Sequence, residues 1–225
     1  MKMLLRLLVL IAAALLGLAL AWAMLQLPPP AVRLAQQVDA QMHASGVTHP
    51  VTAVLLNFRG YDTLLEIAVL LLALLGVLAA AAGAPSSVRP LGGAPQPLLQ
   101  ALVRLLAPLM VLVAGYLLWA GSHRAGGAFQ AGAVLAGSGV LLHLAGLMPD
   151  WADPPRLLRT GLAAGFLIFL SVATLLLWQG ALLQYPPRWA GALILAIEAG
   201  LTLSIALVLA GLFLWLPSEI DGAQQ

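Results

Sequence analysis

The chain has 225 residues, of which 62% are hydrophobic and only 8% are charged. A soluble domain of this length would carry about 25% charged residues, so the composition excludes an ordinary soluble protein. The absence of cysteine excludes disulfides, thiolate metal sites and cysteine nucleophiles. The net charge of +2 is too small for a nucleic-acid-binding surface, and no nucleic-acid partner is expected.

Apolar runs of about 20 residues recur along the chain, and each can cross a ~30 Å hydrocarbon layer as a helix. A membrane barrel would show shorter segments of alternating hydrophobicity instead. The fold class predicted is therefore an all-α integral membrane protein with about six transmembrane helices. Prolines and glycines separate the spans, which we place at residues 4–25, 61–82, 98–120, 127–147, 157–183 and 189–216.

The first span has Lys2 and Arg6 at its start and resembles a signal peptide with a candidate cleavage site after Ala23. Its apolar run exceeds a usual signal core, so we expect it to be retained. Residues 26–51 are more polar and predict a short helix at the membrane surface, followed by a loop with His43 and His49. Two histidines are too few for a zinc site, and no metal site is predicted.

Orientation follows from the lysines and arginines between the spans. With a cytoplasmic N-terminus, six basic residues lie inside and four outside, which favours both termini in the cytoplasm. The glycine- and proline-rich stretch at 83–97 divides the chain into a two-span unit at 1–90 and a four-span unit at 91–225.

Three ionisable groups, Arg59, Asp62 and Glu66, lie at the start of the second span. A charged side chain near a bilayer centre costs about 3 kcal/mol on insertion scales, so such groups suggest a function. Their spacing of i, i+3 and i+7 places them on one face of a continuous helix. Arg59 and Asp62 favour a structural ion pair, whereas Glu66 lies about 6 Å deeper and suits either a proton or cation path or a structural contact.

Two further polar groups lie within later spans. Glu198 has no basic partner near it in sequence, so it is either a proton or cation site or a structural hydrogen-bonding group. His143 titrates near neutral pH, which leaves a proton role beside the commoner role in packing.

The glycine-rich stretch at 121–132 joins the third and fourth spans and predicts a tight turn with a small-residue packing face. Its candidate residues for packing against other subunits are Gly126, Gly127, Phe129, Gln130 and Gly132. The stretch lacks the Gly-Lys-Ser/Thr ending of a phosphate loop. No hydrolase or redox-cofactor motif occurs elsewhere, so no catalytic residue, enzyme activity or cofactor is predicted.

These stretches resemble parts of a known family. Residues 49–67, with Asn57-Phe58-Arg59, Asp62-Thr63 and Glu66-Ile67, resemble the end of the large A subunit of Mrp (Mnh) multi-subunit Na+/H+ antiporters and the E subunit of membrane-bound hydrogenases. Asn57 stands in place of the family's usual aspartate. Residues 121–132 resemble the glycine-rich signature of the MnhB/MrpB subunit, and Glu198 stands where that subunit has an aspartate.

The resemblance implies a fusion of an MrpA C-terminal segment with an MnhB/MrpB subunit. It implies a multi-pass subunit of a Na+/H+ antiporter in the bacterial inner membrane, in which Glu66, Asp62, Arg59, Glu198 and His143 contribute to a proton or cation path. The implied partners are the large A and D subunits, the small C, E, F and G subunits, membrane lipid, Na+ and H+. The alternative is a structural adaptor in a complex I-like, hydrogenase-linked or inorganic-carbon-uptake complex.

Overall fold

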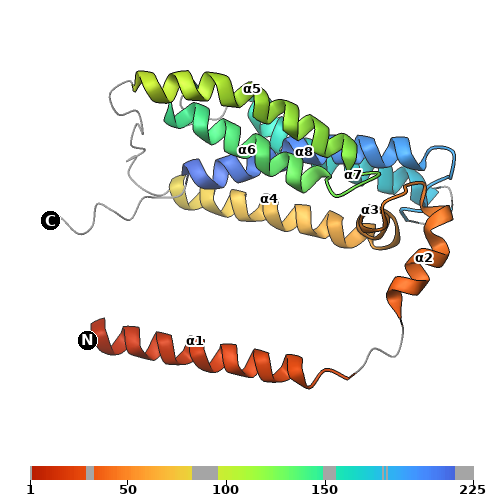
Figure 1. Cartoon of the computed structure of the whole chain (residues 1–225), viewed down its shortest axis with the longest axis horizontal. Coiled ribbons are helices and arrows are strands. Elements are labelled where there is room, and N and C mark those ends of the chain that lie inside the picture. The colour runs from red at the N-terminus through yellow and green to blue at the C-terminus, as the bar shows by residue number, and fades with distance from the viewer. Residues whose placement is uncertain are drawn as a thin grey trace. The chain divides into compact units, whose positions relative to one another are not determined.

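The structure is a computed structural model that describes residues 2–28, 33–82, 96–148, 156–178, 180 and 182–215. Helices make up its elements, and no strand occurs within these ranges, which confirms the predicted all-α fold (Figure 1). In chain order the elements are α1 (Lys2–Leu25), α2 (Leu34–Ser45), α3 (Pro50–Ala53), the π-helix η1 (Val54–Phe58), α4 (Gly60–Ala82), α5 (Pro97–Ala120), α6 (Ala128–Leu144), α7 (Arg156–Trp178) and α8 (Ala190–Trp215).

Five of the described helices, α1, α4, α5, α7 and α8, are long and apolar enough to cross a membrane. The remaining predicted span, α6, has 17 residues and is about 25 Å long, which is less than the ~30 Å hydrocarbon layer. It starts only after Gly127 and ends before a turn in which Gly146 has a φ of +66°. Because glycine adopts this left-handed conformation without strain, the turn stops the helix three residues short of the predicted end.

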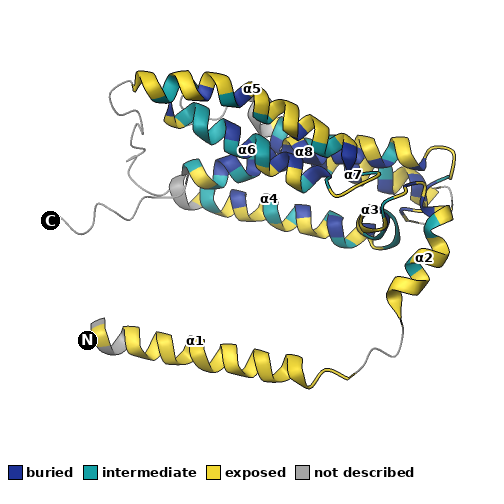
Figure 2. Cartoon of the chain, viewed as in Figure 1, coloured by how far each residue is buried: buried dark blue, intermediate teal, exposed yellow. Residues whose placement is uncertain are grey.

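The described chain forms two compact units, residues 1–37 and 38–225. In the first, α1 is exposed along its length. In the second, α8 contacts α4, α5, α6 and α7, and it is the most buried span (Figure 2). The predicted division between residues 90 and 91 falls within 83–95, outside the described residues.

Small residues allow the helices to approach α8 closely. A Cβ added at Gly165 of α7 would lie 2.7 Å from the Gly200 carbonyl oxygen, and one at Gly132 of α6 would lie 2.9 Å from Ile205. The hydroxyl of Ser204 donates a 2.5 Å hydrogen bond to the Leu162 carbonyl oxygen. Close backbone approach and hydrogen bonds between helices are the main attractions available to helices in lipid.

The helix expected from Tyr61 begins earlier and is interrupted. Pro50 occupies the first turn of α3, the π-helix η1 follows, and the backbone leaves helical geometry at Arg59 before α4 starts at Gly60. The Thr63 hydroxyl donates a 2.6 Å hydrogen bond to the Leu55 carbonyl oxygen across this break. The prediction that Arg59, Asp62 and Glu66 share one face of a continuous helix is therefore wrong for Arg59. This residue precedes the helix that carries Asp62 and Glu66.

The surface helix predicted within residues 26–51 corresponds to α2. It ends at Ser45, so His43 lies in its last turn rather than in the following loop, where His49 lies as predicted. The Ser45 hydroxyl donates to the Met42 carbonyl oxygen at 2.7 Å and accepts from the Val47 amide at 3.3 Å, and it thereby stabilises the turn after the helix.

The loop between α7 and α8 folds back onto the break before α4. Leu183 is buried at a φ of +57°, and a Cβ added at Gly60 would lie 2.9 Å from its side chain. Tyr185 is buried in the same cluster, and its hydroxyl has no hydrogen-bond partner among the described residues. Burial raises the pKa of the Tyr185 phenol above its ordinary value.

The orphaned phenol predicts that Tyr185→Phe will not destabilise the chain at neutral pH, and that it will stabilise it by up to about 1 kcal/mol. The folded state disfavours ionised Tyr185, so stability falls once the phenol of the unfolded chain ionises above about pH 10. The variant will lack this contribution, and its thermal midpoint in detergent will fall less steeply between pH 9 and 11. A lower midpoint at neutral pH would show that the hydroxyl has a stabilising partner.

Candidate functional site in a cavity between α4, α6 and α8

A cavity of about 250 Å³ brings together groups that are far apart in the sequence. Glu66 of α4, Gln130 of α6 and Glu198 of α8 line it, together with Thr52 of α3 and Thr63 of α4. Glu66 lies about 9 Å along α4 and Glu198 about 12 Å along α8, measured from the helix starts at the same end of the bundle. The cavity therefore lies within the membrane-spanning part of the fold.

Glu198 is the most buried acidic group in the described part of the chain, with 4% of its surface exposed. Its carboxyl accepts a hydrogen bond from the backbone N–H of Ala128, the first residue of α6. Its Oε2 is buried and has no partner among the described residues. One side of the carboxyl is therefore held by the protein, and the other has an unused acceptor.

The start of α6 is built around this carboxyl. Gly127 has a φ of +109°, and a Cβ there would lie 2.8 Å from Glu198 Oε1; one at Gly121 would lie 3.2 Å from the same atom. Glycine at both positions lets the backbone close around the acid. The first amides of a helix lack internal acceptors and carry partial positive charge, so α6 stabilises a negative charge on Glu198.

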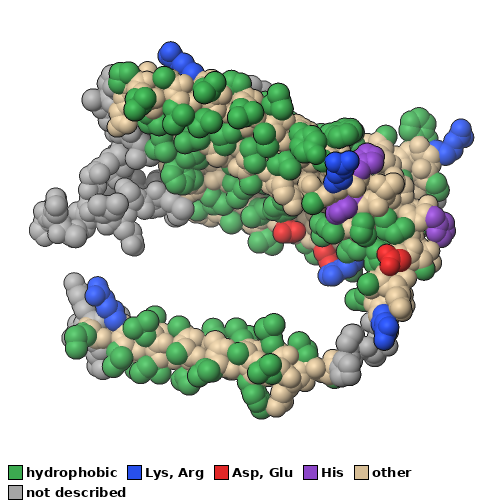
Figure 3. Space-filling view, viewed as in Figure 1, with side chains coloured by type: hydrophobic (Ala, Val, Ile, Leu, Met, Phe, Trp, Pro, Cys, Tyr) green, Lys and Arg blue, Asp and Glu red, His purple; other side chains and the backbone are tan. Residues whose placement is uncertain are grey.

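Glu66 lies at the outer side of the cavity, where it is exposed. On the face shown in Figure 3, hydrophobic side chains cover most of the helical surface, and the coloured acidic side chains lie toward the end of the bundle near α3. An ionisable group exposed on an apolar helix surface is costly against lipid. We therefore expect water or a neighbouring protein, rather than lipid, to contact Glu66 at this surface.

Residues 48–52 are hydrogen-bonded to the loop that precedes α6. The Thr52 hydroxyl donates to the Gly121 carbonyl oxygen, and the backbone amides of Thr48 and His49 donate to that of Ser122, at 3.2 and 3.1 Å. The sequence did not single out Thr52 or Thr63, because a threonine in an apolar helix usually bonds to its own backbone. The signal available in the sequence was Gly60 within an apolar run, because such a glycine can mark a break in a helix that leaves acceptors for these hydroxyls.

The other predicted path residues lie apart from the cavity. Arg59 and Asp62 form an ion pair, as their structural interpretation predicts, and neither lines the cavity. His143 lies 15 residues after Ala128, about 22 Å along α6, and its Nδ1 is buried without a partner among the described residues. The structure thus joins Glu66 with Glu198 but not with His143.

The predicted packing residues make contacts within the chain. Gly126, Gly127, Phe129 and Gln130 line the cavity, and Gly132 lies against Ile205 of α8. The glycines thereby allow close contacts among α5, α6 and α8, and the role of these residues in contacts with other subunits stays a prediction.

Comparison with known proteins agrees with this arrangement. In the "Structure of Mrp complex from Dietzia sp. DQ12-45-1b", a matching chain has a TM-score of 0.72 and 23% identity, with 98% of this chain and 26% of that chain covered. The present chain thus spans about a quarter of the length of that protein. In the "Structure of the membrane-bound sulfane sulfur reductase (MBS), an archaeal respiratory membrane complex", a chain matches with a TM-score of 0.68 and 22% identity, covering 93% of this chain and 97% of that one.

At these identities the two structures establish a shared fold. A search of curated proteins finds no match. A family model does match: residues 98–216, more than half of the chain, fit the model described as "Domain related to MnhB subunit of Na+/H+ antiporter". This range contains the start of α6 and Glu198. The chain is therefore a multi-pass membrane protein that belongs to the family of domains related to the MnhB subunit of Na+/H+ antiporters.

Proposed function

We propose that the chain is a non-enzymatic subunit of a multi-subunit Na+/H+ antiporter and that the cavity between Glu66 and Glu198 is part of its proton or cation path. The observation that carries the proposal is that two intramembrane acids from different helices line one cavity. Membership of the MnhB-related family and the fold shared with a chain of the Mrp complex support the setting.

The chemistry follows from the two carboxyl groups. Each can hold either a proton or part of the coordination of a monovalent cation, because Na+ prefers oxygen ligands. Thr63 and Gln130 line the same cavity and carry further oxygens. A proton and a cation compete for the same acids in this cavity, and this competition couples their exchange. The buried Oε2 of Glu198 and the exposed side of Glu66 supply an inner and an outer position.

The exposure of Glu66 supports a path that runs between subunits. Neighbouring chains would cover this surface, and the partners proposed are the large A and D and the small C, E, F and G subunits of an Mrp-type complex. We further propose a bacterial inner-membrane location with both termini cytoplasmic. In this proposal residues 1–90 correspond to the end of an A subunit and residues 91–225 to an MnhB/MrpB subunit.

Glu66→Gln tests the path in the assembled complex. The substitution keeps the size of the side chain but removes its charge, so Na+-dependent proton exchange in membrane vesicles should fall about tenfold, equal to ~1.4 kcal/mol in the barrier. Water at the outer side of the cavity can replace part of the function of Glu66, which limits the loss.

Asp62→Asn is the matched control, because Asp62 lies one turn away on α4 and does not line the cavity. We expect it to change exchange less than twofold while the complex remains assembled. Normal exchange in an assembled Glu66→Gln complex would contradict the path and leave the structural adaptor as the function.

A further inference from the structure

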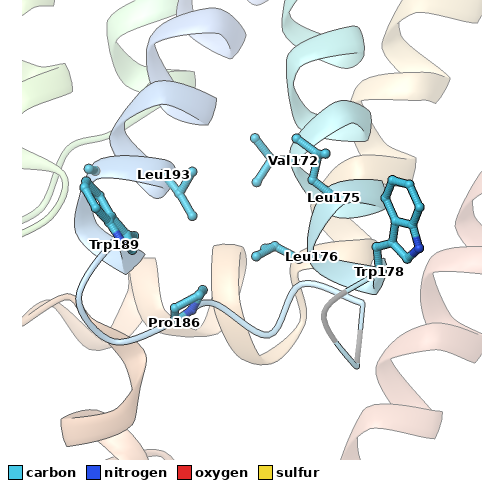
Figure 4. A pocket seen from close by; sticks show the side chains of 8 residues that line it. Val172, Leu175, Leu176, Trp178, Pro186, Trp189 and Leu193 are labelled. Carbon is cyan, nitrogen blue, oxygen red and sulfur yellow. The ribbon is translucent and has the colours of Figure 1, made fainter.

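An apolar groove of about 660 Å³ opens beside the connection between α7 and α8. Figure 4 shows Val172, Leu175 and Leu176 of α7 opposite Leu193 of α8, with Pro186 of the connecting loop below them. Trp178 and Trp189 flank the groove, and they are 90% and 66% exposed. The groove volume lies in the range of about 300–1,000 Å³ that is typical of sites for small ligands.

The groove lies at the end of two membrane spans. Trp178 is the last residue of the span in α7, and Trp189 directly precedes the span in α8. From Val172 to Trp178 the wall extends about 9 Å along the helix. Tryptophan is enriched where hydrocarbon meets the headgroup layer. The groove therefore occupies the outermost part of the hydrocarbon layer, with its closed end toward the headgroups.

The loop at that end of the groove carries a cation. Arg188 is exposed and lies between the loop residue Pro186 and Trp189, both of which line the groove. Within the described ranges the only ion pair joins Arg59 to Asp62, so Arg188 has no acidic partner there. Arginine binds phosphate through two parallel N–H donors, and the indole N–H groups of the two tryptophans add neutral donors at the same level.

We propose that this groove binds an anionic phospholipid, with one acyl chain between α7 and α8 and its phosphate held by Arg188. The apolar walls favour a hydrocarbon chain, and the basic end favours an anionic headgroup. The apolar part lies toward the membrane interior and the basic part toward the headgroup layer, which matches the orientation of a phospholipid. A transmembrane helix of a partner fits less well, because the Pro186 loop closes the groove where such a helix would have to continue.

Native mass spectrometry of the full chain in detergent tests the proposal. The probes are phosphatidylglycerol and phosphatidylcholine with identical acyl chains, added stepwise. The native chain should retain one phosphatidylglycerol about tenfold more tightly than phosphatidylcholine. Arg188→Gln should remove this preference, and Leu193→Trp, which fills the groove, should weaken the retention of both lipids at least tenfold.

Arg124→Gln is the matched control, because Arg124 is an exposed cation in the loop between α5 and α6 and does not line the groove. It should keep the full preference for phosphatidylglycerol. Arg188 is on the surface, so its variant remains informative even if Leu193→Trp does not fold. Equal retention of the two lipids by the native chain, or an unchanged preference in Arg188→Gln, would overturn the proposal.

Discussion

Replacing Glu198 by Gln will lower Na+-dependent proton exchange of the assembled complex about a hundredfold, equal to ~2.7 kcal/mol in the barrier. Glutamine has the same shape, and its amide oxygen can still accept the hydrogen bond from Ala128, so the start of α6 is preserved. It cannot bind and release a proton. Because Glu198 is 4% exposed, water cannot replace it as it can at Glu66.

The measurement is proton uptake into membrane vesicles after a sodium pulse, with the amount of assembled complex determined in parallel. Thr202→Val is the matched control on the same helix. Thr202 is buried, its hydroxyl donates only to the Glu198 carbonyl oxygen, and it does not line the cavity. Near-normal exchange by an assembled Glu198→Gln complex would exclude Glu198 from the path, while its contact with α6 would remain structural.

Replacing Gly127 by Ala should destabilise the protein by about 2–4 kcal/mol. The backbone there has a φ of +109°, which is strained for any residue with a Cβ, and the new methyl group would lie 2.8 Å from Glu198 Oε1. Relief requires the start of α6 to move or Glu198 to leave its hydrogen bond with Ala128. Exchange should fall with stability, because the displaced carboxyl is the same group that the proposed path uses.

Thermal unfolding in detergent, followed by circular dichroism, measures the effect. Gly139→Ala on the same helix is the matched control, because a Cβ there meets no atom within 4 Å. Alanine is favoured over glycine inside a helix by about 0.5–1 kcal/mol, so this control should be neutral or slightly stabilised. Equal midpoints for the two variants would show that the backbone at Gly127 tolerates a side chain.

The sequence was sufficient to predict the helices, because each apolar run must satisfy its backbone hydrogen bonds internally once it is in lipid. The ends of α4, α5 and α8 lie within one residue of the prediction, since proline and glycine mark them. The end of α7 was placed too late, at residue 183. Leu182 and Leu183 extend the apolar pattern beyond the helix, but Leu183 and Tyr185 are buried in a loop whose Leu183 packs on Gly60.

The candidate residues could be predicted individually, because an ionisable group in an apolar run costs free energy in the membrane and therefore suggests a function. Their grouping was not predictable. A spacing rule joined Arg59 to Glu66, but Arg59 lies outside the helix that carries Glu66, between the end of η1 at Phe58 and the start of α4 at Gly60. The Thr63 hydroxyl bonds to the Leu55 carbonyl oxygen across this break, a contact that residue spacing does not show. Glu198 and His143 appeared equally isolated in the sequence, and only one of them lines the cavity with Glu66.

The amino-acid sequence alone determined that this protein is helical, that it lies in a membrane and which of its few acids are costly to bury. These properties depend on composition and on residues close together in the chain. The tertiary structure decided that Glu198 meets the start of α6, that Glu66 lies on the same cavity and that Arg59 and Asp62 satisfy each other instead. Helix packing sets these relations, because close contacts at glycines such as Gly127 and Gly165 select which faces of distant helices come together.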